Sequence, residues 1–213
     1  MYQAILLCSM LIIGFIFPVQ GQTKYETEME KAMTEWGEAK SSDELERAAQ
    51  HFDRIAKVEK DNWLPLYYAM FIRALNALSM DKDQAIKQAD ELENLYVHFE
   101  GLKADESEIL TLRGLFRTIK VMKDPETYGM SLSGAIIKDY DDALKLNPNN
   151  PRAMYLMAQF NMGGARFWGK DPKEYCGPVE KAKTLFPKEK PADFTPSWGE
   201  SQVDEVLETI CKK

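Results

Sequence analysis

The chain has 213 residues, of which 45% are hydrophobic and 29% charged, and its formal net charge at pH 7 is −7. This length is enough for one domain with a substantial core. The acidic balance argues against nucleic acid or an anionic membrane as the main partner, because both require clustered lysines and arginines.

The first predicted element is a signal peptide at residues 1–21. Residues 4–17 are almost entirely apolar, and no charged side chain occurs before Lys24. Such a run is too short to span a bilayer but fits the apolar core of a signal peptide. Small residues place cleavage after Gly21, and removing residues 1–21 from the 213-residue chain leaves 192 residues. A buried first helix, or an uncleaved anchor, is the alternative.

Helical periodicity predicts a series of helices joined by short turns after the signal peptide. Apolar residues recur at spacings of three and four, and capping residues separate the runs. No segment combines alternating apolar and polar residues with hairpin turn chemistry, so the fold class is all-α. The apolar stripes of the expected helices lie within residues 24–40, 45–56, 63–78, 85–96, 105–122, 125–146, 151–160, 179–186 and 203–210. Ser41, with Glu44 three positions on, is the expected cap of the second helix, and Asp124 and Asn150, each followed by proline, are the expected caps of the sixth and seventh.

The junction between two of these helices, at residues 136–160, carries a family pattern. Ile136, Tyr140, Ala143 and Pro148 stand where a tetratricopeptide repeat has its small residue, aromatic residue, alanine and proline. The segment therefore resembles the junction between two tetratricopeptide (TPR) repeats, which are helix pairs of about 34 residues.

The resemblance implies a right-handed superhelical solenoid of antiparallel helix pairs over residues 22–186. The prolines at 187–199 predict an extended connector on the surface, which a C-terminal capping helix at 200–213 would follow. Solenoids of this kind bind peptides or proteins on a concave surface lined by the first helix of each pair. If the pattern carries over, the side chains facing this groove are those of Tyr67, Phe71, Arg152, Tyr155 and Gln159.

Residues 161–169 depart from the pattern, because they contain too many glycines for an ordinary helix interior. They predict a loop that presents Arg166 and Trp168 as a possible contact site, since both residue types are enriched at interface hot spots. Packing of Trp168 over the preceding helix pair is the favoured alternative. Residues 164–170 nearly spell a phosphate-binding loop, but a helix precedes them and no Ser or Thr follows the lysine.

Cysteine and histidine usage offers no cofactor or metal site. Cys8 is lost with the signal peptide, and Cys176 and Cys211 remain. In an oxidising compartment this pair suggests a disulfide, with two reduced buried thiols as the alternative. His51 and His98 have no second ligand nearby in the sequence. No catalytic constellation is recognisable, so we expect no enzymatic activity.

The predicted function is an exported, non-enzymatic protein–protein interaction module with a protein or peptide partner. The absence of any Asn-x-Ser/Thr site favours a bacterial envelope, with the protein periplasmic or secreted. The alternative is a small-ligand-binding helical carrier, or an accessory subunit of an envelope uptake system. A carrier would have an enclosed apolar pocket near Trp168, with lining residues predicted to be Tyr67, Tyr68, Trp168 and Tyr175.

Overall fold

The computed structural model describes residues 23–189 and 192–212, so the predicted signal peptide lies outside the described residues. Within these ranges the chain forms helices and turns, and no strand is present. The α-helices are α1 (Lys24–Glu38), α2 (Ser42–Val58), α3 (Trp63–Ser79), α4 (Lys82–Leu95), α5 (Glu106–Lys123), α6 (Pro125–Leu146), α7 (Pro151–Phe167), α8 (Cys176–Leu185) and α9 (Glu200–Val206). Shorter helical segments are η1 (Tyr96–Phe99), η2 (Pro172–Tyr175), η3 (Phe186–Lys188) and the π-helical η4 (Leu207–Cys211).

Local capping fixes where these helices begin, as the sequence predicted. The Ser41 hydroxyl accepts a hydrogen bond from the backbone N–H of Glu44, whose carboxylate accepts one from the Ser41 N–H. Asp124 and Asn150 cap α6 and α7, each of which has proline in its first turn. Side chains and prolines close in sequence therefore set these boundaries.

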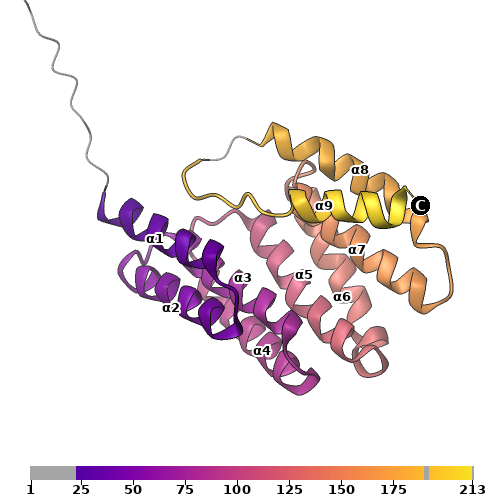
Figure 1. The fold of residues 1–213 in the computed structure, drawn as a ribbon, viewed down its shortest axis with the longest axis horizontal. Coiled ribbons are helices and arrows are strands. Elements are labelled where there is room, and N and C mark those ends of the chain that lie inside the picture. The colour runs from indigo at the N-terminus through magenta and orange to yellow at the C-terminus, as the bar shows by residue number, and fades with distance from the viewer. Residues whose placement is uncertain (1–22, 190–191, 213) are drawn as a thin grey trace, which may run out of the picture.

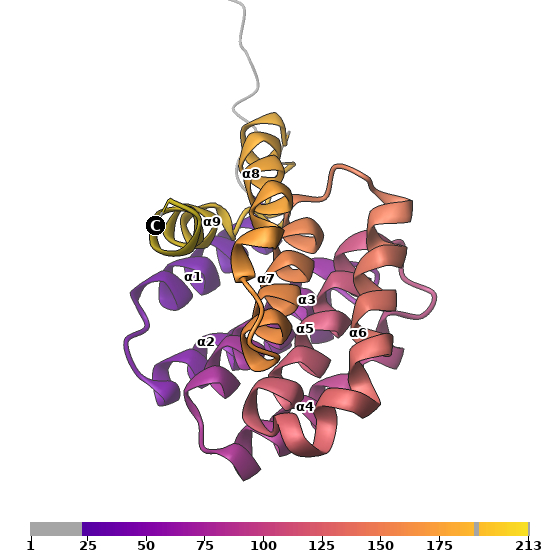
Figure 2. The ribbon, with the colours of Figure 1, turned by 90° about the vertical axis from the view of Figure 1, so that its right-hand side faces the viewer.

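The helices from α1 to α8 pack on one another in chain order, and α3, α5 and α7 also contact one another in series (Figures 1 and 2). Helices α3, α5 and α7 form an inner layer, and α2, α4 and α6 lie outside it. The terminal helix α9 packs on α8. In the part of the chain that the structure covers, no helix has both the length and the apolar character needed to cross a membrane.

Helices α5 and α6 approach each other closely at Gly114. A Cβ atom placed on Gly114 would lie 2.6 Å from the ring of Tyr140, so only glycine fits there. Tyr140 is fully buried, and its hydroxyl lies 3.2 Å from that of Thr118. The aromatic position of the repeat pattern is therefore filled by a ring that presses on the backbone of the neighbouring helix.

Two local predictions after residue 160 are wrong. The expected glycine loop is helical, because α7 continues through Gly163 and Gly164 to Phe167. Buried Met162 and Ala165 hold this last part of α7 against the core, which offsets the low helix propensity of glycine. The helix expected at 179–186 also begins earlier, at Cys176, because α8 includes Pro178 within its first turn, where the missing N–H removes no helical hydrogen bond.

The connector between η3 and α9 was predicted to lie extended on the surface. In the structure Pro196 and Gly199 are buried, and Phe194 and Trp198 pack against the hydrophobic core. Figure 1 shows this segment passing over the end of the bundle near α1 before it joins α9. The prolines correctly exclude a helix, but the aromatic residues between them turn the segment inward.

Candidate ligand-binding cleft

A cleft of about 350 Å³ lies between α1, α3 and the connector, open on one side. Small-molecule sites are typically clefts of this size or larger with mainly apolar and aromatic walls. Its described lining residues are Met33 and Trp36 of α1, Tyr68 of α3, and Ala192, Phe194, Thr195, Ser197 and Trp198 of the connector. The cleft thus joins parts of the chain that are far apart in sequence.

Aromatic rings form the floor of the cleft. Trp198 stacks on Phe71 with 4.3 Å between ring centroids, and Trp36 meets the same Phe71 edge to face at 5.8 Å. Trp36 also lies 5.9 Å from Tyr68. Such pairs prefer these offset and edge-to-face arrangements, so the indoles are held in place before any ligand arrives.

The connector is fixed over α3 by hydrogen bonds with two neighbouring tyrosines. The hydroxyl of Tyr68 donates to the carbonyl oxygen of Phe194 at 3.0 Å. The indole N–H of Trp198 donates to the hydroxyl of Tyr67, also at 3.0 Å. Phe194 has a φ of 63°, which costs energy in a residue other than glycine and persists where surrounding contacts impose it.

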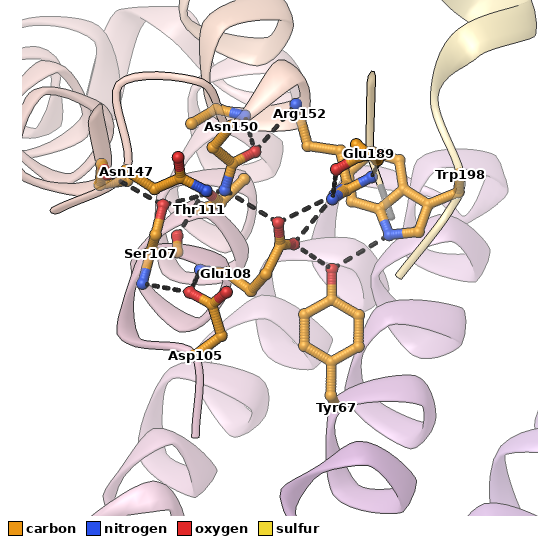
Figure 3. Close-up of polar contacts among 12 residues, drawn as sticks. Tyr67, Asp105, Ser107, Glu108, Thr111, Asn147, Asn150, Arg152, Glu189 and Trp198 are labelled. Carbon is orange, nitrogen blue, oxygen red and sulfur yellow. Dashed lines mark hydrogen bonds and ion pairs between the residues drawn. The ribbon is translucent and has the colours of Figure 1, made fainter. Parts of the chain in front are cut away.

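A buried polar network lies beneath Trp198 (Figure 3). The Tyr67 hydroxyl donates to Glu108 at 3.1 Å, and the Arg152 Nε lies 3.0 Å from both oxygens of the same carboxylate. The other end of the Arg152 guanidinium donates to Glu189, just before the connector. Arg152 therefore ties α5, α7 and the start of the connector together.

Burial perturbs the ionisation of this network. Burial raises the pKa of Glu108, and the positive charge of Arg152 offsets part of that rise. Burial also raises the pKa values of Tyr67 and Tyr68 above the ordinary value for a phenol. Both phenols therefore remain neutral hydrogen-bond donors at neutral pH.

A second, smaller hollow of about 250 Å³ adjoins the cleft and shares Phe194 with it. Its other lining residues are the acidic Glu26, Glu30 and Asp193. The cleft itself is lined by neutral side chains in the part of the chain that the structure describes. Among those described residues, His, Cys, Asp and Glu nowhere gather in a group able to hold a metal ion.

The residues predicted to face an open groove are mostly buried. Tyr67, Phe71, Arg152 and Tyr155 are each at most 3% exposed, and Gln159 alone of this set is exposed. The expectation of an open surface at these positions is therefore wrong. Trp198 covers Tyr67 and Phe71, and the carboxylates of Glu108 and Glu189 enclose the charge of Arg152. The prediction did not anticipate that the C-terminal segment would fold back over the inner layer.

The residues predicted for the contact loop and for the carrier pocket lie only partly where they were expected. Trp168 is 69% exposed at the end of α7 and packs edge to face on Phe167, so it does not cover the preceding helix pair. Arg166 is exposed beside it. Of the aromatics expected to line a pocket, Tyr68 lines the cleft and Tyr67 lies directly beneath Trp198.

Cys176 and Cys211 form a disulfide with an S–S distance of 2.01 Å. The disulfide joins the first residue of α8 to the last residue of η4. Tyr175, which was predicted to line a pocket, directly precedes Cys176 and is partly buried. The bond ties the terminal helix to the bundle. It therefore secures the far end of the segment that carries the connector.

Comparison with known proteins finds one informative likeness. The chain is similar to the HusA haemophore from Porphyromonas gingivalis, with 27% sequence identity and a TM-score of 0.74. The alignment covers 91% of this chain and 94% of the haemophore chain. No family model and no curated protein matches this chain. The likeness therefore extends over nearly the whole length of both proteins.

Sequence reasoning missed Trp36, Phe194 and Trp198 as cleft residues. Trp36 lies near the end of a helix that is otherwise rich in Glu, Met and Ala, so its direction could not be inferred. Phe194 and Trp198 did carry a signal, because large aromatic residues in a proline-rich segment seldom remain fully solvated. Their place in the fold, however, depends on helices more than a hundred residues earlier in the chain.

Proposed function

We propose that this protein is an exported, non-enzymatic carrier that binds a small, flat, mostly apolar ligand in the aromatic cleft. The observation that carries the proposal is the set of ring walls formed by Trp36, Tyr68, Phe194 and Trp198 around about 350 Å³. The similarity to a haemophore supports it, because a haemophore is by name a carrier of haem. Haem is therefore the first ligand to test.

The chemistry of the walls indicates how such a ligand would be held. Aromatic pairs in stacked or edge-to-face contact contribute about 0.5–1.5 kcal/mol beyond the area they bury. Trp36 and Trp198 are positioned by Phe71 and can each offer a ring face or edge. The thioether of Met33 and the neutral phenol of Tyr68 are weak partners for a metal, so ring contact supplies most of the affinity.

We further propose that the helix pairs stack as a TPR-like right-handed superhelix over residues 22–186, capped by the C-terminal helix. The serial contacts among α3, α5 and α7 support this arrangement. In this proposal residues 1–21 direct export and leave the carrier outside the cytoplasm. The exposed pair Phe167 and Trp168, with Arg166, favours an additional protein contact at the end of α7.

The proposal is tested by titrating haem and metal-free protoporphyrin into the mature protein, residues 22–213. Quenching of tryptophan fluorescence and the shift of the porphyrin absorption band report binding. We expect Trp36→Ala to weaken binding about tenfold, equivalent to about 1.4 kcal/mol, because one ring wall is lost. Trp168→Ala is the matched control, since that indole is exposed away from the cleft.

Two results would overturn the carrier proposal. One is failure of the folded native protein to bind either porphyrin. The other is an equal loss of affinity in Trp36→Ala and Trp168→Ala, which would place the ligand outside the cleft. Circular dichroism of each variant establishes that the helical fold is retained, so a loss of binding can be attributed to the missing ring.

A further inference from the structure

The side chain of His51, on α2, lies between two carboxylates of α1. Its Nδ1 is 2.9 Å from an oxygen of Glu35, and its Nε2 is 3.1 Å from an oxygen of Glu28. His51 is only 7% exposed. A neutral imidazole has one N–H donor and one acceptor nitrogen, whereas a protonated imidazole donates through both nitrogens. Both contacts are therefore hydrogen bonds to ionised carboxylates only when the ring carries both protons.

The α1 side of this arrangement, which we call the His51 bridge, also includes a lysine. The Lys31 ammonium donates to Glu28 at 2.8 Å. Hydrogen bonds from Lys31 and from His51 lower the pKa of the Glu28 carboxyl, so Glu28 stays ionised in mildly acidic solution. The change of charge within the bridge over that range is therefore the proton of the histidine ring.

The other charged groups facing His51 come from α2 itself and from α3. Arg47 and Arg54 lie about one turn away on the same face of α2. Helix α3, which also packs on α2, contains a single charged residue, Arg73, and two carboxylates of α2 hold its guanidinium. Among the residues that the structure describes, the charged groups at hydrogen-bond distance from the ring are thus the two α1 carboxylates.

The bridge matters for the cleft because α1 supplies one of its walls. Met33 and Trp36 line the cleft, and Trp36 directly follows Glu35 in the sequence. Helix α1 packs chiefly on α2. The contact that holds α1 against α2 therefore also sets the position of the Trp36 indole.

We propose that the His51 bridge is a proton-dependent attachment of α1, which makes the cleft bind its ligand more tightly in mildly acidic than in alkaline solution. This inference rests on the proposed carrier function and concerns the regulation of the same site. Histidine gains or loses its second proton between about pH 5 and pH 8. At the acidic end the ring donates to both carboxylates. At the alkaline end a lone pair of one nitrogen faces a carboxylate oxygen, so the attachment weakens.

Hydrogen exchange of the α1 amides in the mature protein measures the attachment directly. Glutamine in place of His51 keeps a side-chain N–H but takes up no proton. The α1 protection factors of His51→Gln should be about threefold or more below those of the native protein at about pH 5.5, and nearly equal to them at about pH 8. In Glu35→Gln the protection should respond less to pH than in the native protein, because an amide pairs with either form of the ring.

Haem titrations at the same two pH values test the effect on the cleft. The dissociation constant of His51→Gln divided by that of the native protein should be about threefold or more at about pH 5.5 and close to one at about pH 8. Both proteins meet the same ligand, so the response of haem itself to pH cancels in this ratio. Circular dichroism establishes that each variant retains the helical fold.

The other histidine of the chain provides the matched control. His98 is exposed on η1, away from α1 in the sequence. His98→Gln removes one titrating side chain, as His51→Gln does, and should match the native protein in α1 protection and in haem affinity at both pH values.

The outcomes separate this inference from the carrier function. A protection ratio for His51→Gln that is the same at both pH values contradicts the inference, as does an equal response in His98→Gln. Protection that responds to pH while the haem ratio stays constant also refutes it, because the bridge would not act on the cleft. If the native protein binds no haem although α1 protection responds as expected, the carrier function fails and the proton-dependent attachment of α1 stands.

Discussion

Replacing Arg152 by alanine gives the sharpest stability test of the network beneath the cleft. The guanidinium is 3% exposed and serves two carboxylates, of which Glu108 is 4% exposed. Without Arg152, the Glu108 carboxylate keeps hydrogen bonds from Tyr67 and Asn150 but loses its positive partner. Removing one member of a buried ion pair typically costs about 3–5 kcal/mol.

The free-energy cost of Arg152→Ala can also be calculated from the protonation of Glu108. Burial already raises the pKa of Glu108 in the folded protein, and loss of Arg152 raises it further because Arg152 was lowering it. Taking up a proton at pH 7 costs about 3.7 kcal/mol for a carboxyl with an unfolded pKa near 4.3, and at pH 5 about 1 kcal/mol. A raised folded pKa means that stability is regained as the pH falls, so the variant should recover between pH 7 and pH 5.

Urea unfolding at both pH values provides the measurement. With a slope on the order of 2 kcal/mol per molar urea, Arg152→Ala should lower the midpoint by roughly 2 M at pH 7 and by much less at pH 5. Arg73→Ala is the control, because Arg73 bridges Glu46 and Asp53 near the surface at 2.9 and 2.7 Å. Its cost should be about 1 kcal/mol with little change between the two pH values.

A pH-independent loss in Arg152→Ala would refute the reasoning about Glu108. So would a loss at pH 7 no larger than that of Arg73→Ala. Combining Arg152→Ala with Glu108→Gln sharpens the result, since the double variant no longer buries an unpaired carboxylate. The stability of the double variant should depend less on pH between pH 5 and pH 7 than that of Arg152→Ala alone.

Two further predictions concern the fold. Replacing both Cys176 and Cys211 by serine should lower the free energy of unfolding by about 3–4 kcal/mol, because the disulfide closes a loop of 35 residues in the unfolded chain. Equal urea midpoints for the native and the fully reduced protein would contradict this. Gly114→Ala should destabilise by about 1–2 kcal/mol, since its Cβ meets the buried Tyr140 ring at 2.6 Å. Gly134→Ala, with open space around it, should instead stabilise by up to about 1 kcal/mol, and thermal melts compare the two.

The features that sequence reasoning predicted well are the local ones. The starts of α2, α6 and α7 depend on a cap or proline within a few residues, so the printed sequence contains nearly all the information. The prediction of helix at 125–146 ends at the residue where α6 ends, because Asn147-Pro148 cannot continue it. A loop was wrongly predicted at Gly163 and Gly164, because the burial of neighbouring side chains outweighs the low helix propensity of glycine.

The cleft could not be predicted in the same way, because its contacts are distant in sequence. Tyr68 and Phe194 are 126 positions apart, and Tyr67 and Trp198 are 131 apart. No periodicity or capping rule links such positions. The prolines of the connector therefore led to the prediction of a surface segment, and nothing local in the sequence showed that Phe194 and Trp198 would turn inward.

The difference between an open groove and a covered one bears directly on function. A peptide-binding solenoid exposes the inner helices along their length, so that a chain can lie across them. Here Trp198 stacks on Phe71 and shields Tyr67, and Glu189 holds Arg152 at the start of the same segment. What remains open is a short aromatic space beside Trp36, which fits a small flat molecule better than an extended peptide. In the proposed carrier, the C-terminal segment thus covers the surface that an extended peptide would need and leaves the aromatic cleft for a small ligand.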